Sequence, residues 1–382
     1  MRSLYEEMLE EARKAVSLDR AGRHKEAVEH YMRATELLIK LSKTAPDPSL
    51  RKVYAQKAEL YLKRCEELRS GLTGEGGPRA RETLGVEEVL KKLPPELQGV
   101  VLVEKPGVGW DDIGGLEEAK KRLMEAVVWP MLKPELFKGP REPWRGILLF
   151  GPPGCGKTLL AKAVASQCEA TFFNVSAAAI MSKWLGESEK NVSLLFDVAR
   201  KAAPSVIFMD EVDSLLSLRG LEEVGGERRV KTQFLIELDG LRTREREGVV
   251  VIGATNRPWD LDPAVIRRFE RRIYVPLPDF EARKEIFTIH LRGVELADDV
   301  DLDELAEVSV GYSGADIRLV CREAAMEPLR ELMEKGVPPE GEVEIRPVCK
   351  ADFVKALRKI KPAVSPSDVR RYVEWAEKYG EL

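Results

Sequence analysis

Asparagine, glutamine and long apolar runs are scarce in this chain. Among 382 residues the only asparagines are Asn174, Asn191 and Asn256, whereas charged residues make up 33%. Few thermolabile amides together with many charges are typical of thermophilic proteins. No apolar run approaches the ~18 residues of a membrane span, and the first residues, MRSLYEEMLEEARK, are too charged for a signal peptide. We therefore expect a cytoplasmic protein.

Cysteine is also sparse, and its spacing excludes two common scaffolds. The five cysteines form no CxxC pair; they are Cys65, Cys155, Cys168, Cys321 and Cys349. This odd number argues against a disulfide framework or a zinc ribbon and fits a reducing compartment. The net charge is −4 with both signs abundant, so the composition does not indicate nucleic-acid binding. The length predicts about two to three domains, and a hydrophobic content of 44% is enough to build their cores.

The first 70 residues carry three apolar stripes. The stripes begin at Leu4, Ala27 and Tyr54, and their apolar residues recur at the three- and four-residue steps of an amphipathic helix. We predict a three-helix bundle over residues 1–70. The plain interpretation is a bundle that only closes on itself. Recognition of a partner is a further hypothesis, because a unit this small has little else to do.

The rest of the chain changes character twice. Residues 71–106 are rich in glycine, proline and charge, and are predicted to be a flexible linker. Short apolar runs then alternate with charged amphipathic segments, which predicts an α/β domain with a parallel sheet over 107–280. The predicted strands are GILLF 146–150, TFFNV 171–175, SVIFM 205–209, GVVVIG 248–253 and RIYVP 272–276. Residues 281–382 are predicted to form a smaller helical domain.

The strongest motif is GPPGCGKT at 151–158. It follows GILLF directly and precedes a helical stretch, which is the context that GxxxxGK[ST] requires. The glycines let backbone N–H groups converge on phosphate oxygens. Lys157 supplies a positive charge for the β- and γ-phosphates of ATP, and Thr158 a hydroxyl for Mg²⁺. A plain glycine-rich turn, the alternative, would need neither side chain. The predicted nucleotide contacts of this loop are Pro153, Gly154, Cys155, Gly156, Lys157, Thr158 and Leu159.

Polar residues follow two later strands. SVIFM ends in Asp210 and Glu211, and GVVVIG runs into Asn256. An aspartate beside the phosphates can hold Mg²⁺ together with Thr158, and a second carboxylate can deprotonate an attacking water. Because a nucleotide switch needs only the first carboxylate, the pair favours a hydrolase. Asn256 is the candidate to face the γ-phosphate. The alternatives are a solvated acidic turn and an ordinary turn asparagine.

These motifs resemble those of an AAA ATPase, a P-loop α/β domain with a helical lid. WDDIGGLEEAKKRL at 110–123, the two phosphate motifs, ATNRPWDLDPAVIRRFERR and GYSGAD occur in that family's order over about 107–382. SKWLGESEK and ERRIYVPLPD narrow the resemblance to the meiotic clade, which holds katanin, spastin and the vacuolar protein sorting-associated ATPase that disassembles ESCRT-III. Residues 1–70 resemble the microtubule-interacting and transport (MIT) domain of those proteins. The whole chain most resembles the archaeal cell-division (Cdv) branch.

The resemblance implies a homo-hexameric ring that assembles on ATP binding. Arg267 and Arg268 match the family's arginine fingers, which act on the nucleotide of the neighbouring subunit. Such fingers contribute roughly 10³–10⁵ in rate in other enzymes. Arg271 and Arg272 lie close by in the sequence, and we interpret them as exposed edge charges leading into a strand.

The resemblance also assigns residues around the base. Ile113 and Gly114 match the entrance of the adenine pocket, and Gly314 and Ala315 match the lid residues against the base. Asn174 resembles a residue that restrains the catalytic glutamate until substrate arrives. An asparagine with a merely local hydrogen bond is the alternative.

SKWLGESEK places a large apolar pair in a charged, loop-like stretch. In the family ring the loop after the second strand faces the central channel, and Lys183, Trp184 and Leu185 match its first pore loop. An aromatic side chain there can grip a translocating peptide by apolar contact without reading its sequence. The alternative is a tryptophan tucked into its own subunit. LEEVGGER at 221–228 would be the second pore loop, or else an ordinary surface loop.

The end of the chain shows one departure from eukaryotic relatives and one agreement. Only EKGVPPEGEVEIRPV at 334–348 lies where those relatives insert a small β domain that recruits an activator, so we expect no such activator. The closing SPSDVRRYVEWAEKYGEL resembles the clade's C-terminal helix, which packs back on the ATPase domain.

The predicted function is an ATP-hydrolysing ring. It would pull ESCRT-III-like subunits from membrane-bound filaments, in membrane remodelling or archaeal cell division, with residues 1–70 recognising the filament proteins. The alternative is severing of tubulin-like polymers, although the linker lacks a dense basic run for an acidic polymer. A nucleotide-gated scaffold is a further alternative, and Asp210 and Glu211 argue against it. Recruitment to a membrane or division site is expected through partners, because no basic amphipathic helix or lipidation signal is present.

Overall fold

The structure is a computed structural model of the 382-residue chain. It describes residues 4–20, 23–44, 101–137, 139–177, 188–217, 225–243, 248–335 and 345–381, and the single positions Arg51, Tyr54, Lys57, Ala58, Tyr61, Cys65, Val89, Leu93, Pro94, Leu97 and Ile180. The chain divides into two compact units, Met1–Glu82 and Thr83–Leu382. None of the described helices is long and apolar enough to cross a membrane.

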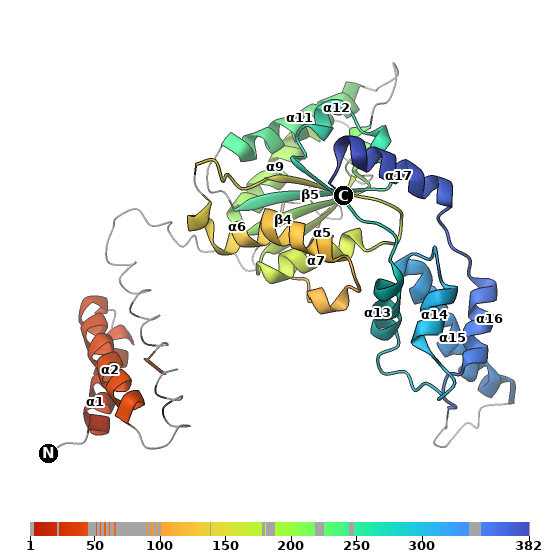
Figure 1. The fold of residues 1–382 in the computed structure, drawn as a ribbon. Helices are drawn as coiled ribbons and strands as arrows, with labels where there is room; N and C mark the ends of the chain where they lie inside the picture. Colours follow the sequence, from red (N-terminus) through yellow and green to blue (C-terminus); the bar gives the residue numbers. More distant parts are fainter. Residues whose placement is uncertain are drawn as a thin grey trace. The chain divides into compact units, whose positions relative to one another are not determined.

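The first unit is a small helical bundle. Its two continuous helices are α1 (Leu4–Arg20) and α2 (His24–Thr44) (Figure 1). Apolar residues of both helices share two buried clusters with Ala58 and Cys65, which belong to the third predicted helix. The thiol of Cys65 donates to the carbonyl oxygen of Val28 at 3.7 Å. The described positions of the third stripe therefore lie against the first two helices, as their apolar period requires.

The second unit is built on a six-stranded sheet in the order β1-β3-β4-β5-β2-β6. Neighbouring strands are parallel except at one edge, where β1 pairs antiparallel with β3. The strands are β1 (Val101–Glu104), β2 (Gly146–Phe150), β3 (Thr171–Ser176), β4 (Ser205–Asp210), β5 (Val249–Thr255) and β6 (Arg271–Tyr274). The five predicted strands and their parallel arrangement are confirmed, with small shifts at the strand ends.

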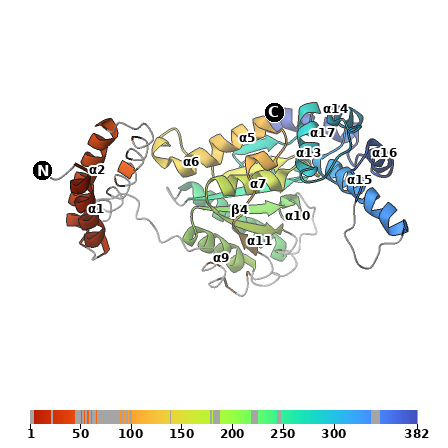
Figure 2. The same cartoon turned by 90° about the horizontal axis from the view of Figure 1, so that it is seen from below.

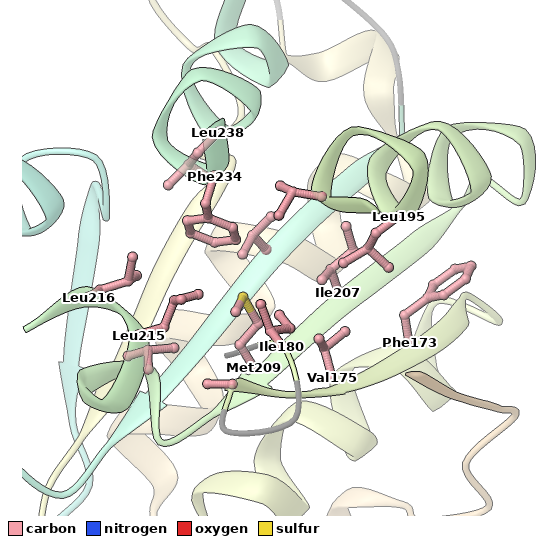
Figure 3. Close-up of a cluster of buried hydrophobic side chains, with 14 of the residues drawn as sticks. Phe173, Val175, Ile180, Leu195, Ile207, Met209, Leu215, Leu216, Phe234 and Leu238 are labelled. Carbon is pink, nitrogen blue, oxygen red and sulfur yellow. The ribbon is translucent and has the colours of Figure 1, made fainter. Parts of the chain in front are cut away.

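Helices cover both faces of the sheet. Figure 2 shows α5, α6 and α7 on one side of β4, and α9 and α11 on the other. Because side chains alternate along a strand, Phe208 of β4 packs into the core under α7, whereas Ile207 and Met209 pack into the core under α9 and α11. Figure 3 shows this second core, with Leu195 and Phe234 beside them. The helices and helical turns are η2 (Trp110–Asp112), α5 (Glu117–Leu123), η3 (Met124–Val128), α6 (Trp129–Leu132), η4 (Pro134–Leu136), α7 (Lys157–Gln167), α9 (Ser188–Lys201), α10 (Val212–Leu216), α11 (Gly225–Thr243), η5 (Pro258–Asp260) and α12 (Pro263–Ile266).

The predicted linker over 71–106 is too long at its end. Val101–Glu104 forms the edge strand β1, in which alternate side chains are buried and Leu102 is 59% exposed. Val89 and Leu97 are buried in the same core as the sheet. A four-residue strand with one buried face carries too short an alternation to be recognised beside so much glycine, proline and charge.

Beyond β6 the described chain is helical, as predicted. Four helices form the lid; they are α13 (Phe280–His290), α14 (Leu302–Val308), α15 (Gly314–Lys335) and α16 (Lys350–Lys359). Phe287, Ile317 and Phe353, from α13, α15 and α16, are fully buried in one shared core. Figure 1 shows these helices as one group. Most of the short segment in place of the β domain, 336–344, lies outside the described residues.

The last helix, α17 (Pro366–Tyr379), packs on the sheet domain (Figure 1). Ser365 is its N-cap, and a proline follows at the first helical position, where its missing N–H costs nothing. Trp375 belongs to the core of the sheet domain, and its ring centroid lies 4.5 Å from that of Phe150. The predicted packing of the C-terminal helix is confirmed.

Candidate nucleotide site

The loop between β2 and α7 needs its glycines. Gly151, Gly154 and Gly156 have φ values of +148°, +76° and +95°, which L side chains rarely adopt. Gly151 also has no room for a side chain, because a Cβ atom would lie 2.2 Å from the carbonyl oxygen of Val275. The loop leads into the N-terminus of α7, whose first N–H groups have no partner within the helix. Such a helix N-terminus binds phosphate.

Lys157 is a buried cation inside this loop. Its side chain is 6% exposed, and its Nζ donates to the carbonyl oxygens of Gly151 at 2.9 Å and Pro152 at 2.7 Å. Burial lowers the pKa of Lys157 from its usual value of 10.5 to about 8. Two neutral carbonyls compensate only part of the lost hydration. A phosphate oxygen would therefore be a better partner for this ammonium group.

Thr158 and Asp210 meet across the gap between the loop and β4. The Thr158 hydroxyl donates to Asp210 Oδ2 at 3.2 Å, and Asp210 Oδ1 accepts the backbone N–H of Glu211 at 2.9 Å. A hydroxyl and a carboxylate are hard oxygen donors, and Mg²⁺ is bound by one or two such groups together with phosphate oxygens. The residues therefore fit the ion.

Glu211 has an unusual backbone. Its φ of 50° and ψ of 46° lie in the left-handed region, directly before α10, and its side chain is exposed. A residue other than glycine is strained there. Such strain persists only where the surrounding structure enforces it, and strained residues cluster at functional sites.

The end of β5 lies next to the loop. Phe150 of β2 pairs with Thr255, so Asn256 follows β5 where Gly151 follows β2. Thr255 is fixed by its hydroxyl, which donates to Asp213 Oδ1 at 2.6 Å. The side-chain oxygen of Asn256 is buried and has no hydrogen-bond partner among the described residues. The three predicted strand-end features are therefore brought to one edge of the sheet.

The lid meets the phosphate loop on the side predicted to hold the base. The N–H of Ala315 donates to the carbonyl oxygen of Gly154 at 3.0 Å. A Cβ atom on Gly114 would lie 2.8 Å from Ile286 Cγ1, and one on Gly314 would lie 3.3 Å from the Gly154 carbonyl. Ile113, the residue before Gly114, is buried. Gly114 and Gly314 both lie near Ile286, so the predicted base-side residues come together; their contact with a base stays a prediction.

The two predicted arginine fingers differ in their surroundings. Arg268 donates from Nε to Asp239 Oδ2 at 2.8 Å and from a terminal nitrogen to the Ala264 carbonyl at 3.0 Å. Arg267 is exposed. Its guanidinium makes no hydrogen bond or ion pair within the described part of the chain. Of the two arginines, Arg267 is thus the one whose side chain is exposed.

Arg271 and Arg272 are not the exposed edge charges that the sequence indicated. Both lie within β6 and are half-buried. Arg271 pairs with Glu381 at 2.7 Å, and its guanidinium carbon lies 4.6 Å from the ring centroid of Trp144. Arg272 donates to the carbonyl oxygen of Ile266 at 3.1 Å. Long-range packing near the chain end covers them, and local sequence carries no sign of it.

Three predicted features lie outside the described residues or stay predictions. Lys183, Trp184 and Leu185 are outside the described residues, as is the first half of the predicted second pore loop. Asn174 lies within β3, paired with Leu102 on β1 and with Phe208 on β4. Its proposed restraint of the glutamate is not visible in this pairing.

Sequence reasoning missed two residues that lie against predicted site residues, Ser313 and Tyr372. A Cβ atom on Gly154 would lie 2.7 Å from Ser313 Oγ, and Ser313 is itself bonded to Asp316 at 2.8 Å. Ser313 lies within the GYSGAD motif, so the motif could have pointed to it. Tyr372, whose hydroxyl donates to the carbonyl oxygen of Asn256 at 2.6 Å, had no such signal.

A glycine loop between β2 and α7, a buried lysine in that loop and an aspartate at the same edge of the sheet, at the end of β4, define a P-loop nucleoside triphosphatase. Residues 147–277 match the ATPase family associated with various cellular activities (AAA), and residues 299–340 match the AAA+ lid domain. Residues 6–70 match the MIT (microtubule interacting and transport) domain, and residues 330–380 match the Vps4 C terminal oligomerisation domain.

The chain belongs to the AAA ATPase family. A crystal structure of the FIGL-1 AAA domain in complex with ADP is 45% identical with a TM-score of 0.67, covering 78% of this chain and 98% of that chain. Katanin p60 ATPase-containing subunit A1 of Arabidopsis thaliana is 50% identical over 301 residues, which cover 75% of this chain and 58% of that protein. The cell division cycle protein 48 homolog of Archaeoglobus fulgidus is 52% identical over 302 residues, or 77% of this chain and 41% of that protein. The chain thus spans about half the length of these two relatives.

Proposed function

We propose that the chain hydrolyses ATP at this site and uses the energy to move a protein substrate. The observation that carries hydrolysis is the carboxylate pair at the end of β4. Asp210 accepts hydrogen bonds from the Thr158 hydroxyl and from the N–H of Glu211. The Glu211 carboxylate is therefore the member of the pair that would act on the attacking water. A nucleotide switch would not need this second carboxylate.

Each residue of the site has a role in this proposal. Thr158 and Asp210 would hold Mg²⁺, which neutralises charge on the β- and γ-phosphates when bound. Lys157 would exchange its two carbonyl partners for phosphate oxygens. Glu211 would accept a proton from the attacking water, and the unpaired oxygen of Asn256 would orient that water.

The adenine would lie at the junction between the loop and the lid. Ile113 and Gly114 approach α13, and Gly314 and Ala315 approach the loop at Gly154. An added Cβ atom on Gly114 or Gly314 would crowd Ile286 or the Gly154 carbonyl, so these glycines let the chain approach α13 and the loop closely. Nucleotide would then bind the lid and the sheet domain at once.

We propose a homo-hexamer that assembles when ATP binds. The match of residues 330–380 to an oligomerisation domain supports assembly. In such a ring an exposed Arg267 would reach the nucleotide of the neighbouring subunit, where a cation stabilises charge on the transferring phosphoryl group. Arg268 would support Arg267 from within its own subunit, because the Arg268 guanidinium already donates to Asp239.

The proposed substrates are ESCRT-III-like filament proteins. Residues 6–70 match the MIT domain, which supports a protein partner for the first unit. Lys183, Trp184 and Leu185 would grip the substrate in the pore. The proposed setting is the cytoplasm of an archaeal cell, with recruitment to a membrane or division site through partners.

Severing of tubulin-like polymers is the second candidate. The 50% identity to a katanin subunit supports it. The residues of the nucleotide site serve either function, because both need the same hydrolysis.

The test uses the full chain and the E211Q variant with ATP. Each is incubated with purified ESCRT-III-like filaments and, separately, with a tubulin-like polymer, and the sedimented polymer is measured. ATP-dependent loss of the ESCRT-III-like filaments with the unaltered chain alone supports the proposal. Loss of only the tubulin-like polymer would replace it with severing. No phosphate release by the unaltered chain would refute the ATPase itself.

A further inference from the structure

The C-terminal helix reaches the nucleotide site through one hydrogen bond. Tyr372 of α17 is 4% exposed, and its hydroxyl donates to the main-chain carbonyl oxygen of Asn256 at 2.6 Å. The two residues are 116 positions apart in the chain. Asn256 is the residue whose side-chain oxygen is buried without a partner among the described residues.

The ring of Tyr372 is fixed independently of this hydrogen bond. It lies 5.0 Å from the ring centroid of Trp259 and 6.4 Å from that of Tyr274, and these rings belong to η5 and β6. The guanidinium carbon of Arg371 lies 3.7 Å from the ring centroid of Trp259. Aromatic and cation–π contacts of this kind stabilise a ring in one orientation. The hydroxyl is therefore held in place before it bonds to Asn256.

The backbone around Asn256 is fastened on both sides. Before it, the Thr255 hydroxyl donates to Asp213 and also accepts the N–H of Arg257 at 2.9 Å. After it, the peptide carbonyl is held by Tyr372. A side chain takes its direction from the two peptides that flank it, so these bonds set where the Asn256 amide is aimed. A misplacement of about 1 Å in a positioned group can lower a rate by about 10²-fold.

Burial also keeps Tyr372 a donor. The pKa of Tyr372 is raised to about 12, with burial as the largest cause. The hydroxyl therefore stays protonated at any pH at which the chain would be assayed.

We propose that Tyr372 is a positioning residue for ATP hydrolysis, which holds the Asn256 backbone so that the Asn256 side chain meets the attacking water. This inference rests on the proposed function. It gives α17 a role in the chemical step in addition to any role in assembly. The hydroxyl acts through Asn256 and does not touch the nucleotide.

The first test is Y372F, which removes the hydroxyl and keeps the stacked ring. We expect kcat to fall about tenfold, the size of effect that one lost hydrogen bond of this kind produces. KM for ATP, the melting temperature and the ring mass measured by light scattering with ATP are expected to stay unchanged. Y379F is the matched control. Tyr379 is 39% exposed on the same helix, and its ring lies 5.3 Å from that of Trp375. Removal of the Tyr379 hydroxyl should leave kcat unchanged.

A double-mutant cycle then asks whether Tyr372 acts through Asn256. N256A should slow hydrolysis strongly, and Y372F should cause no further loss in the N256A background. Full additivity would overturn the inference, as would an unaltered kcat in Y372F or a parallel loss of melting temperature or ring mass. The proposed function fails separately: an unaltered chain that releases no phosphate would refute hydrolysis and the inference with it.

Discussion

The backbone N–H of Ala315 donates a hydrogen bond to the carbonyl oxygen of Gly154 at 3.0 Å. This bond joins the first turn of α15 in the lid directly to the phosphate loop. Gly154 has no space for a side chain on this side, because Ser313 Oγ and Ala315 Cβ would lie 2.7 Å and 2.8 Å from an added Cβ atom. A change in the conformation of the phosphate loop would therefore also move the first turn of α15 in the lid.

The first prediction concerns this contact. G154A should weaken nucleotide binding at least about tenfold, because it adds both a strained φ and a clash with the lid. G293A is the matched control, since Gly293 has a φ of +78° and nothing within 4 Å of an added Cβ atom. Titration with a fluorescent nucleotide measures both. Equal affinities of the two variants would show that the lid contact does not matter.

The second prediction concerns the base. E211Q should bind ATP normally, lose about 10²–10⁴-fold in hydrolysis, and accumulate as a ring, because the nucleotide that holds subunits together is no longer consumed. Phosphate release and light scattering measure this. E118Q, an exposed glutamate on α5, is the control. Normal turnover by E211Q would remove Glu211 as the base.

The third prediction separates the two arginines. R267A should lose about 10³-fold or more in turnover while keeping its affinity for nucleotide. R268A should lose much less turnover and only slightly lower the melting temperature, because its ion pair with Asp239 is partly exposed.

A mixing experiment shows whether Arg267 acts on the neighbouring subunit. R267A lacks the finger but keeps Glu211, whereas E211Q lacks the base but keeps Arg267. Mixed rings bring an intact base and an intact finger to one site, so turnover should exceed that of either variant alone. No gain on mixing would argue that Arg267 acts within its own subunit.

The fourth prediction is a pH dependence of binding. The pKa of Lys157 is lowered to about 8, whereas a bound phosphate favours the charged form. Above pH 8 the free chain loses the Lys157 proton and must regain it on binding, so affinity should fall by up to about tenfold per pH unit. Calorimetry at pH 9 in two buffers of different ionisation enthalpy should detect proton uptake. An affinity that stays flat from pH 7.5 to 9.5 would contradict the lowered pKa.

The fifth prediction concerns the pore loop. W184A should keep nucleotide binding and hydrolysis but lose substrate remodelling, because the apolar grip is lost without a change at the phosphates. W184F should retain part of the remodelling, since it keeps an aromatic ring. Filament disassembly is the measurement. Unimpaired disassembly by W184A would end the pore-loop hypothesis.

Local motifs carried most of the fold and most of the nucleotide site. GPPGCGKT lies between a strand and a helix in the sequence itself, so its phosphate loop forms from contiguous residues whose glycines allow the required φ values. Short apolar runs likewise predicted the five parallel strands from contiguous residues. A strand that is covered by helices on both faces is apolar throughout. The edge strand β1 was not predicted, because its alternation of buried and exposed residues spans only four residues.

Sequence alone determined that this chain is a P-loop ATPase with a helical lid and an N-terminal bundle. Only the tertiary structure decided which of two adjacent arginines is presented outward, because Asp239, 29 residues away, takes Arg268. Only the tertiary structure joined Tyr372 to Asn256 across 116 residues. Such partners are chosen by how separate elements pack, and a local pattern of residue types does not encode which distant group a side chain will meet.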